Sequence, residues 1–338
     1  MTQILPKAEQ DTTGPRRRFR RAVVLGGAGF VGSHLCEALI AAGTSVLCVD
    51  NFLTGSPDNV ADLVDRPGFQ LVEHDATTAL HPRWLVQPVD LVLHLASPAS
   101  PFDYLRHPLQ TLHAGSDATE QGLLLARDHG ARFVLASTSE IYGDAEVHPQ
   151  PETYLGNVNP IGPRSVYDEA KRYAEAITFA YHRTYGVDVA VARIFNTYGT
   201  RMRAADGRLV PAFVGAALVG EPLTVFGDGE QTRSLCHVSD TVAGLLALAA
   251  ADTTGPVNLG NPDECTVRTL AERIIALAGS DSVIRHGPAV TDDPRRRCPD
   301  ISRARSLLGW RPTVDLDDGL QDTIAWFTAL PATDLVTT

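Results

Sequence analysis

Hydrophobic and polar positions fall into blocks along the chain: short apolar runs end in polar residues, and longer amphipathic segments lie between them. Apolar runs without polar alternation predict strands buried on both faces, as in a parallel sheet. The runs predict strands at residues 21–25, 45–50, 71–75, 91–97, 133–136, 187–194 and 257–260. The amphipathic segments predict helices at residues 33–42, 116–129, 166–185, 266–279 and 316–328. This alternation predicts an α/β fold with a doubly wound parallel Rossmann sheet.

The alternation loosens after about residue 200, where glycine, proline and arginine recur. We expect a smaller C-terminal domain there, which closes over the free end of whatever the sheet binds. The predicted organisation is a flexible arm at 1–20, a Rossmann domain at 21–200 with a returning segment near 235–260, the smaller domain at 201–234 and 261–330, and a tail at 331–338.

A glycine-rich turn follows the first predicted strand, with Gly26, Gly29 and Gly32 at every third position. The first glycine permits a tight turn, the second lets the backbone approach a pyrophosphate, and the third allows close packing of helix and strand. The helix that follows offers free N–H groups to phosphates. Asp50 ends the next strand about 20 residues later, where an acid binds adenosine ribose hydroxyls. A carboxylate there also repels a 2′-phosphate, so the sequence predicts NAD rather than NADP.

Further positions complete the predicted dinucleotide site. Asp75 and Ala76 end the third strand and can border the adenine, and the fourth strand ends in small residues that leave room for a cofactor. The other predicted cofactor residues are Phe30, Val31, Asn51, Leu95, Ala96, Ser97 and Thr111, together with Tyr167 and Lys171. His94, inside the fourth apolar run, is interpreted as a core histidine.

The fifth predicted strand runs into two hydroxyls and a carboxylate, at Thr138, Ser139 and Glu140. Ligands of open α/β sheets bind at this carboxyl end of the strands. Tyr167 and Lys171 lie four residues apart, so they share one face of a helix. The chain uses arginine for nearly all its basic residues but keeps an amine at Lys171, which can share a proton where arginine cannot. A threonine, a tyrosine and a lysine beside a nicotinamide would oxidise and reduce an alcohol.

Composition narrows the possible partners. The chain has 338 residues, 44% of them hydrophobic, and a formal net charge of -11, which argues against nucleic acid or anionic membrane as the main partner. No run approaches the ~18 apolar residues of a membrane span, and the N-terminus lacks the apolar core of a signal peptide. Five scattered cysteines without a C-x-x-C pair suit a reducing compartment and argue against a disulfide framework or a zinc site. We expect a cytoplasmic protein without a metal.

Four stretches make the sequence recognisable, at residues 95–101, 137–144, 159–165 and 292–300. Over residues 21–330 the chain resembles the extended short-chain dehydrogenase/reductase superfamily, and within it the UDP-glucuronic acid decarboxylases, also called UDP-xylose synthases. The glycine and tyrosine–lysine motifs mark the superfamily, whereas these four stretches are more specific. The resemblance implies an NAD-binding Rossmann domain and a nucleotide-sugar-binding C-terminal domain.

The resemblance also implies roles for individual residues. Thr138, Tyr167 and Lys171 match the catalytic hydroxyl–tyrosine–lysine set, Glu140 matches the catalytic glutamate, and Ser139 matches a small hydroxyl beside it.

At the substrate, Arg297 matches the arginine that faces the sugar carboxylate, and Arg233 falls where the nucleotide diphosphate is held. The predicted substrate-binding residues are Pro98, Tyr104, Asn196, Arg208, Arg233 and Arg297. The chain departs from the family pattern at Ser56, where an arginine is expected, and at Gly115, Ala118 and Gln121.

The implied reaction converts UDP-glucuronic acid to UDP-xylose through a 4-keto intermediate, with NAD recycled. In this interpretation Lys171 and the positive nicotinamide lower the pKa of Tyr167, and Tyr167 removes the proton of the 4-hydroxyl. Arg297 binds the carboxylate. The alternatives are a nucleotide-sugar 4,6-dehydratase, a 4-epimerase and a non-catalytic dinucleotide sensor, which the fold alone would not exclude. Dehydratases have an aspartate where this chain has Ser139, which favours decarboxylation.

Two further features are expected partly by analogy. The helices at 116–129 and 166–185 have more apolar residues than a one-sided helix needs, so we expect a homodimer that pairs through them. The nucleotide base, uracil or thymine, is left open.

Overall fold

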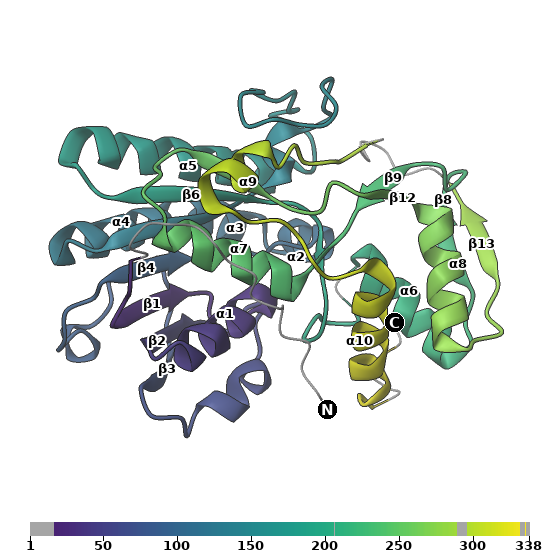
Figure 1. The fold of residues 1–338 in the computed structure, drawn as a ribbon, viewed down its shortest axis with the longest axis horizontal. Coiled ribbons are helices and arrows are strands. Elements are labelled where there is room, and N and C mark those ends of the chain that lie inside the picture. The colour runs from purple at the N-terminus through teal and green to yellow at the C-terminus, as the bar shows by residue number, and fades with distance from the viewer. Residues whose placement is uncertain (1–16, 206, 289–295, 332–334, 336–338) are drawn as a thin grey trace.

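The computed structural model describes residues 17–205, 207–288, 296–331 and 335, and within them seven strands form one parallel sheet (Figure 1). The strand order is β3-β2-β1-β4-β5-β6-β11, the doubly wound Rossmann order, which confirms the predicted fold class. The strands are β1 (Arg21–Leu25), β2 (Ser45–Asp50), β3 (Phe69–Glu73), β4 (Leu91–His94), β5 (Arg132–Thr138), β6 (Val189–Ile194) and β11 (Pro256–Leu259). All seven strands are parallel, but successive strands are added in one direction from β1 to β3 and in the other direction from β4 onward. The ligand-binding crevice lies at this switch point, at the carboxyl ends of β1 and β4.

Helices cover both faces of this sheet. Strands β1, β4 and β5 are buried almost throughout, as their unbroken apolar runs predict. Helices α1 (Phe30–Ala41), α7 (Val238–Ala250) and α9 (Ser302–Leu308) pack into the apolar cluster of one face. Helices α4 (Asp117–His129) and α5 (Ser165–Tyr185) pack into the cluster of the other face. The predicted helices at 116–129 and 166–185 therefore differ from these two by one residue at their first turn.

Two short helices that the sequence pattern did not predict precede α4. They are α2 (Pro101–Arg106) and α3 (Pro108–Gly115), and proline stands at the start of each, where its missing N–H costs nothing. Helix α3 approaches α5 closely at Gly115, where an added Cβ would lie 2.5 Å from the backbone oxygen of Ala170. The departure from the family pattern at Gly115 thus coincides with a close contact of two helix backbones.

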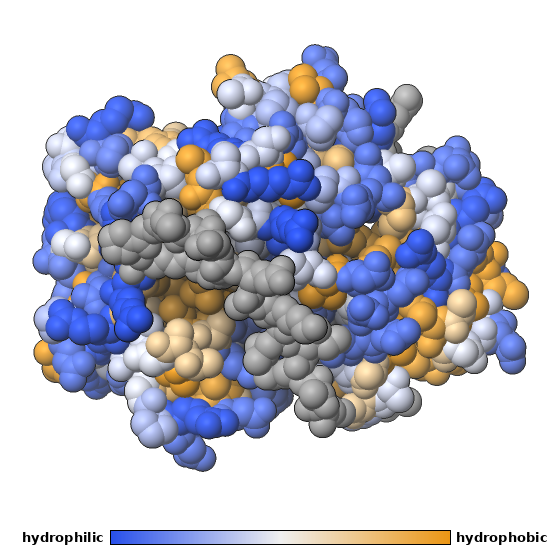
Figure 2. All heavy atoms as spheres, viewed as in Figure 1, coloured by the Kyte–Doolittle hydropathy of each residue, from blue (hydrophilic) through white to orange (hydrophobic). Residues whose placement is uncertain are grey.

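A second group of elements lies beside the sheet, at the right of Figure 1, with its own apolar cluster. Its helices are α6 (Leu209–Val219), α8 (Val267–Ala278) and α10 (Leu316–Thr328). Its small sheets pair β8 (Leu223–Phe226) with β13 (Ile284–Gly287), and β9 (Thr232–Ser234) with β12 (Glu264–Thr266). A further pair, β7 (Thr197–Tyr198) with β10 (Cys236–His237), leads from the main sheet into this group. In Figure 2 hydrophobic residues are visible on the surface of this group and also among the hydrophilic residues over the main sheet.

The described ends of the chain are held against the body. Arg17, within the arm expected at 1–20, forms ion pairs with Asp188 and Asp252, and residues 1–16 of that arm lie outside the described residues. Leu335, in the expected tail, is buried in the cluster of the second group. Among the described residues, no helix combines the length and apolar character that crossing a membrane requires.

Candidate active site

The carboxyl ends of the sheet strands border a cavity of about 340 Å³. Ten predicted site residues line it: Gly26, Gly29, Asp50, Asn51, Asp75, Ala76, Leu95, Ala96, Ser97 and Pro98. They come from the ends of β1 to β4, which lie next to one another in the sheet although their sequences are far apart. The sequence prediction of a dinucleotide crevice therefore corresponds to one continuous cavity.

Two glycines of the turn after β1 are required by close backbone approach. Gly26 has a φ of +80°, and an added Cβ would lie 2.5 Å from the backbone nitrogen of Ala96. A Cβ on Gly32 would lie 2.1 Å from the carbonyl oxygen of Gly26. Helix α1 begins at Phe30, three residues before its predicted start, so Phe30, Val31 and Gly32 form its first turn. Because that turn contains no acidic residue, its free N–H groups can bind a pyrophosphate.

Asp50 supplies the acidic end of the cavity. Its Oδ2 accepts a hydrogen bond from the N–H of Ala28 at 3.0 Å, and its Oδ1 accepts one from Phe52 at 2.9 Å. Burial raises the pKa of Asp50, although these backbone donors oppose the rise. Each carboxylate oxygen can accept further bonds, so the group can also receive ribose hydroxyls. A 2′-phosphate would meet this carboxylate directly, and the residues of the cavity therefore fit NAD.

Two other residues of this region have packing contacts. Thr111 is fully buried, and its hydroxyl donates to the carbonyl of His107 at 2.8 Å, so its contact with a cofactor stays a prediction. His94 is also buried, with Nε2 at 3.1 Å from both Ala114 O and Thr119 Oγ1. These contacts agree with the interpretation of His94 as a core histidine.

The structure brings the three residues of the predicted hydroxyl–tyrosine–lysine set together. Thr138 ends β5, and its side chain is hydrogen-bonded to the hydroxyl of Tyr167 on α5. Lys171, one turn along α5, places Nζ 5.8 Å from the centre of the Tyr167 ring and donates to the carbonyl of Ala136 at 2.9 Å. All three side chains are buried, which shields a proton transfer between them and a substrate hydroxyl from bulk water.

Burial shifts the pKa values of two members of this set. Burial lowers the pKa of Lys171 to about 8. Burial also raises the pKa of Tyr167 above its ordinary value, although the hydrogen bond with Thr138 opposes the rise. With a pKa of about 8, Lys171 stays mostly protonated at neutral pH, so its ammonium and the positive charge of a bound nicotinamide can both favour the ionised tyrosine.

Glu140 lies between two arginines. Arg297 contacts it through both terminal nitrogens, with Nη2 at 2.6 Å from Oε2, and Nη2 of Arg164 lies 2.6 Å from the same oxygen. Burial opposes ionisation, but the charges of Arg297 and Arg164 hold the pKa of Glu140 below its ordinary value. Arg164 was not among the predicted site residues, although it lies in a stretch that supported the resemblance. Two guanidinium groups and one carboxylate leave this cluster with a net positive charge.

A buried carboxylic acid adjoins this cluster. Asp168 follows Tyr167 in α5, is only 6% exposed, and its Oδ1 is buried with no hydrogen-bond partner in the described part of the chain. Burial and the nearby charge of Glu140 raise the pKa of Asp168 to about 7, against the opposing charges of Arg164 and Arg297. Sequence reasoning missed it because an aspartate in an amphipathic helix is ordinarily a surface residue.

Two predicted substrate residues contact other site residues. The ring of Tyr104 on α2 stacks on that of Tyr167, with centroids 5.3 Å apart and planes 9° from parallel. Arg208, just before α6, lies with its guanidinium 5.5 Å from the centre of the Phe30 ring. An arginine of the second group thus adjoins the helix N-terminus that can bind a pyrophosphate.

Asn196 and Arg233, also predicted to bind substrate, are half-buried, whereas Ser139, a predicted catalytic residue, is buried. Asn196 follows β6, and its carbonyl accepts a hydrogen bond from the N–H of Cys236 at 2.9 Å. Arg233 lies on β9, where its Nη1 donates to the carbonyl of Thr232 at 2.8 Å. Ser139 is buried at the start of η3 (Ser139–Tyr142). Contacts of these side chains with a substrate stay predictions.

A network of buried polar side chains connects the elements that hold the site residues. Arg193 on β6 pairs with Glu175 on α5, with Nη2 at 2.8 Å from Oε2, and donates to the hydroxyl of Tyr142 at 3.0 Å. Tyr142 donates to Asn258 on β11 at 2.8 Å, and Asn258 donates to the carbonyl of Asp300 at 3.1 Å. Because the last contact reaches the segment that contains Arg297, the network links α5, the sheet and that segment.

Comparison with known proteins identifies the family. Residues 22–260 match the NAD dependent epimerase/dehydratase family. UDP-glucuronic acid decarboxylase 1 of Danio rerio is 50% identical over 308 residues, which cover 91% of this chain and 72% of that protein. UDP-glucuronic acid decarboxylase 6 of Arabidopsis thaliana is 50% identical over 301 residues, which cover 89% and 86%.

Solved structures agree with this family. A UDP-glucose 4-epimerase from Thermotoga maritima superposes with a TM-score of 0.84 at 29% identity, covering 91% of this chain and 98% of that one. A dTDP-glucose 4,6-dehydratase from Streptomyces venezuelae, solved with NAD bound, gives 0.82 at 29% identity, covering 91% and 96%. The fold is thus shared by enzymes with different reactions, whereas both sequence relatives described above are UDP-glucuronic acid decarboxylases. The chain belongs to the NAD dependent epimerase/dehydratase family and, within it, to the UDP-glucuronic acid decarboxylases.

Proposed function

We propose that this protein decarboxylates UDP-glucuronic acid to UDP-xylose through a 4-keto sugar, using NAD that is regenerated in each cycle. The observation that carries the proposal is the net-positive cluster of buried Arg297 with half-buried Glu140 and Arg164, beside the hydroxyls of Thr138 and Tyr167. It combines a site that oxidises an alcohol with a site that accepts a carboxylate.

The first step is oxidation at carbon 4 of the sugar. Bound NAD⁺ supplies the hydride acceptor. Tyr167 takes the proton of the 4-hydroxyl, and Thr138 holds the same oxygen through its own hydroxyl. Lys171 lies one helical turn away, on the same face of α5, where an amine with a pKa of about 8 can exchange protons near neutral pH.

The second step is loss of carbon dioxide. The 4-keto sugar is a β-keto acid, so its carboxylate leaves as carbon dioxide while the electron pair moves to the new carbonyl. Arg297 orients the carboxylate: its Nε is buried without a partner in the described residues, so a donor remains beyond the two nitrogens that contact Glu140. Glu140, held ionised by both arginines, orders the water that protonates carbon 5. Return of the hydride to carbon 4 completes the cycle.

Ser139 separates this reaction from dehydration on the same fold. A 4,6-dehydratase must protonate a departing 6-hydroxyl, and a serine hydroxyl is far too weak an acid to do so. Carbon dioxide leaves a β-keto acid without a proton donor. Decarboxylation therefore needs the cationic group and not an acid at this position.

The test offers UDP-glucuronic acid, UDP-glucose and dTDP-glucose separately to the purified protein, with products identified by mass. We expect carbon dioxide and a nucleotide pentose from the glucuronate alone. A 4-keto-6-deoxy sugar from either glucose nucleotide would instead establish a dehydratase, and a product of unchanged mass with inverted carbon 4 an epimerase. Turnover of a thymidine-linked glucuronate at a higher kcat/KM would assign the base to thymine.

Arg297→Ala tests the role of the arginine within this proposal. We expect turnover of UDP-glucuronic acid to fall by at least about 100-fold, because a buried charge-assisted pair is lost where the carboxylate must be held. NAD binding, measured by titration, should stay unchanged, since Arg297 lies outside the dinucleotide cavity. Arg297→Lys is the matched control, because lysine keeps the positive charge but lacks the planar guanidinium group. Turnover at the wild-type rate in both variants would refute the assignment.

The proposal also covers assembly and location. Exposed apolar side chains lie at Leu109 and Leu112 on α3 and at Tyr173 on α5, two helices that pack together. These exposed apolar residues on and beside α5 support the homodimer that we expect to pair through α4 and α5. The unclustered free cysteines support a reducing compartment such as the cytoplasm.

A further inference from the structure

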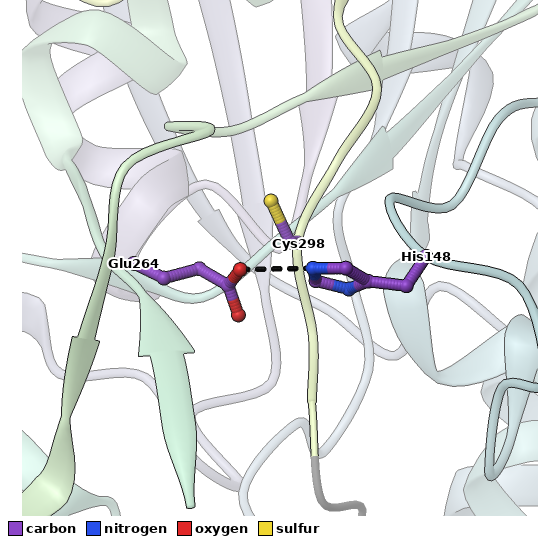
Figure 3. A group of neighbouring side chains, drawn as sticks. All are labelled: His148, Glu264 and Cys298. Carbon is purple, nitrogen blue, oxygen red and sulfur yellow. Dashed lines mark ion pairs between the residues drawn. The ribbon is translucent and has the colours of Figure 1, made fainter.

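Three potential metal ligands that are far apart in the sequence meet beside the segment that contains Arg297. They are His148, Glu264 and Cys298, and their ligand atoms all lie within 4.8 Å of one another. Figure 3 shows the carboxylate of Glu264 facing the imidazole of His148, with the sulfur of Cys298 next to both. The separation of His148 Nε2 and Glu264 Oε2 is 3.0 Å.

Each ligand comes from a segment whose backbone is fixed. The N–H of Cys298 donates to Oε1 of Gln150 at 2.9 Å, and the N–H of Gln150 donates to the carbonyl of Cys298 at 2.9 Å. These bonds tie the His148 segment to the Cys298 segment. Glu264 lies on β12. One of its carboxylate oxygens, Oε2, faces His148, and the other, Oε1, accepts a hydrogen bond from Thr232 Oγ1 at 2.5 Å. Outer hydrogen bonds of this kind orient metal ligands.

The chemistry of the three groups selects the ion. A thiolate, an imidazole and a carboxylate are the ligands of Zn²⁺, whereas Mg²⁺ and Ca²⁺ take oxygen ligands. With Cys298 and Glu264 ionised and His148 neutral, the set has two negative charges, which match a divalent cation. In the structure the thiol of Cys298 donates to the carbonyl of Pro262 at 3.2 Å, so metal binding would replace this contact and release the thiol proton to water.

We propose that His148, Glu264 and Cys298 form a Zn²⁺ site, with water as the fourth ligand, that clamps the segment containing Arg297. The ion joins three segments: the loop before Gln150, strand β12 and residues 297–300. Cys298 is covalently adjacent to Arg297, whose carbonyl already accepts a hydrogen bond from Ser234 at 2.9 Å. Fixing this segment holds the arginine in register with Glu140. The site itself does not depend on the proposed reaction.

The experiment uses the full chain with NAD, stripped of metal by a chelator and then titrated with Zn²⁺ by calorimetry. We expect one Zn²⁺ per chain, a higher melting temperature with the ion, and no comparable effect of Mg²⁺. Co²⁺ in place of Zn²⁺ should give the ultraviolet absorption of a cobalt–thiolate bond. Hydrogen exchange of peptides spanning residues 296–300 should slow when Zn²⁺ is added.

Variants identify the ligands. Cys298→Ser should abolish the cobalt–thiolate absorption and weaken Zn²⁺ binding by more than about 100-fold, because even an outer partner contributes about 10–100-fold. His148→Gln should weaken binding while the protein stays folded. Cys265→Ser is the matched control, since Cys265 follows Glu264 on the same strand and points to the opposite face, where it packs in another cluster. Unchanged binding in Cys298→Ser, or lost binding in Cys265→Ser, would overturn the proposal, and unchanged hydrogen exchange would overturn the clamp.

Discussion

Glu140, Arg164 and Arg297 illustrate how single residues depend on partners that the sequence does not pair. Glu140 and Arg297 are 157 positions apart, yet Arg297 donates through both terminal nitrogens to the carboxylate. The family resemblance assigned these two residues separately, Glu140 as the catalytic glutamate and Arg297 as the arginine that faces the sugar carboxylate. In the structure they form one ionised cluster with Arg164, so removing any member changes the charge seen by the other two.

Tyr167→Phe tests the base at the residue scale. The change preserves the stacking of the ring on Tyr104 but removes the hydroxyl that bonds Thr138. We expect the rate of the first oxidation, followed as reduced nicotinamide absorbance in a single turnover, to fall by about 10²–10⁴-fold. The melting temperature should stay close to that of the wild type. An unchanged oxidation rate in the folded variant would remove Tyr167 from the mechanism.

Asp168→Asn tests the buried acid through the pH dependence of stability. The folded pKa of about 7 lies above the ordinary value of 3.8, so the folded state holds a proton that the unfolded state releases. The wild type therefore loses stability as the pH rises from about 4 to 7, at up to about 1.4 kcal/mol per unit of pKa shift. The amide of the variant has no proton to lose in this range.

The measurement is urea unfolding of both proteins between pH 5 and pH 8. The stability of Asp168→Asn relative to the wild type should increase with pH and level off above about pH 7. Glu169→Gln, the adjacent and more exposed carboxylate, is the matched control for the loss of one charge. A difference for Asp168→Asn that does not vary with pH would contradict a raised pKa.

At the scale of elements, the site depends on how closely helices and strands approach. The glycine turn allows α1 to start directly over β1, and the network from Glu175 to Asn258 joins α5, β6 and β11. A buried pair such as Arg193 and Glu175 costs more to break than it contributes, because a single partner leaves an uncompensated charge. These elements therefore hold Tyr167 and Lys171 against the end of β5.

Gly115→Ala tests the contact between α3 and α5. Helix propensity alone would favour alanine over glycine by about 1 kcal/mol. The new Cβ, however, would meet the backbone oxygen of Ala170 at 2.5 Å, so the backbone of one of the two helices must shift. We expect a net destabilisation of about 1–3 kcal/mol in urea unfolding, as for other overpacked sites.

Ala325→Gly, at an exposed position of α10, measures how much helix propensity contributes to the stability of the same protein. It should cost about 1 kcal/mol. If Gly115→Ala were instead as stable as the wild type or more so, the two helices would not be in the close contact that the structure shows.

At the scale of the whole molecule, the sheet group and the second group contribute complementary halves of the site. The sheet supplies the dinucleotide cavity and the catalytic side chains, and the second group brings Arg208 next to Phe30 at the start of α1. We propose that this second group, with its separate apolar cluster, is the nucleotide-sugar-binding domain. The exposed apolar residues on α3 and α5 belong to the same scale, because the proposed second copy of the chain would bury them.

Tyr173→Glu tests the proposed dimer. Tyr173 is 51% exposed on α5, and a carboxylate there would place two like charges in a symmetric apolar interface. We expect light scattering at micromolar concentration to give a dimer for the wild type and a monomer for the variant. Val283→Glu, a similarly exposed apolar position in the second group, next to β8, should remain dimeric. A monomeric wild type would refute the proposal.

Local patterns in the sequence were sufficient to specify several parts of this protein. Unbroken apolar runs specified the buried strands, since a strand covered on both faces needs no polar alternation. The glycine spacing specified the dinucleotide turn, because only glycine permits the backbone contacts of Gly26 and Gly32. The spacing of Tyr167 and Lys171 placed both side chains on one helical face.

Features that join distant segments depend instead on how the chain folds. Arg164 and Asp168 belong to the site because η3, α5 and the segment at 297 converge, and burial there opposes the charge of Asp168. The short helices α2 and α3 are stabilised by packing on α5 rather than by a periodic pattern. The sequence argued against a zinc site because its cysteines are scattered, yet folding brings Cys298 to His148 and Glu264. The spacing of residues along the chain can reveal metal ligands that lie on one helix or strand. It cannot reveal ligands that come from three separate segments.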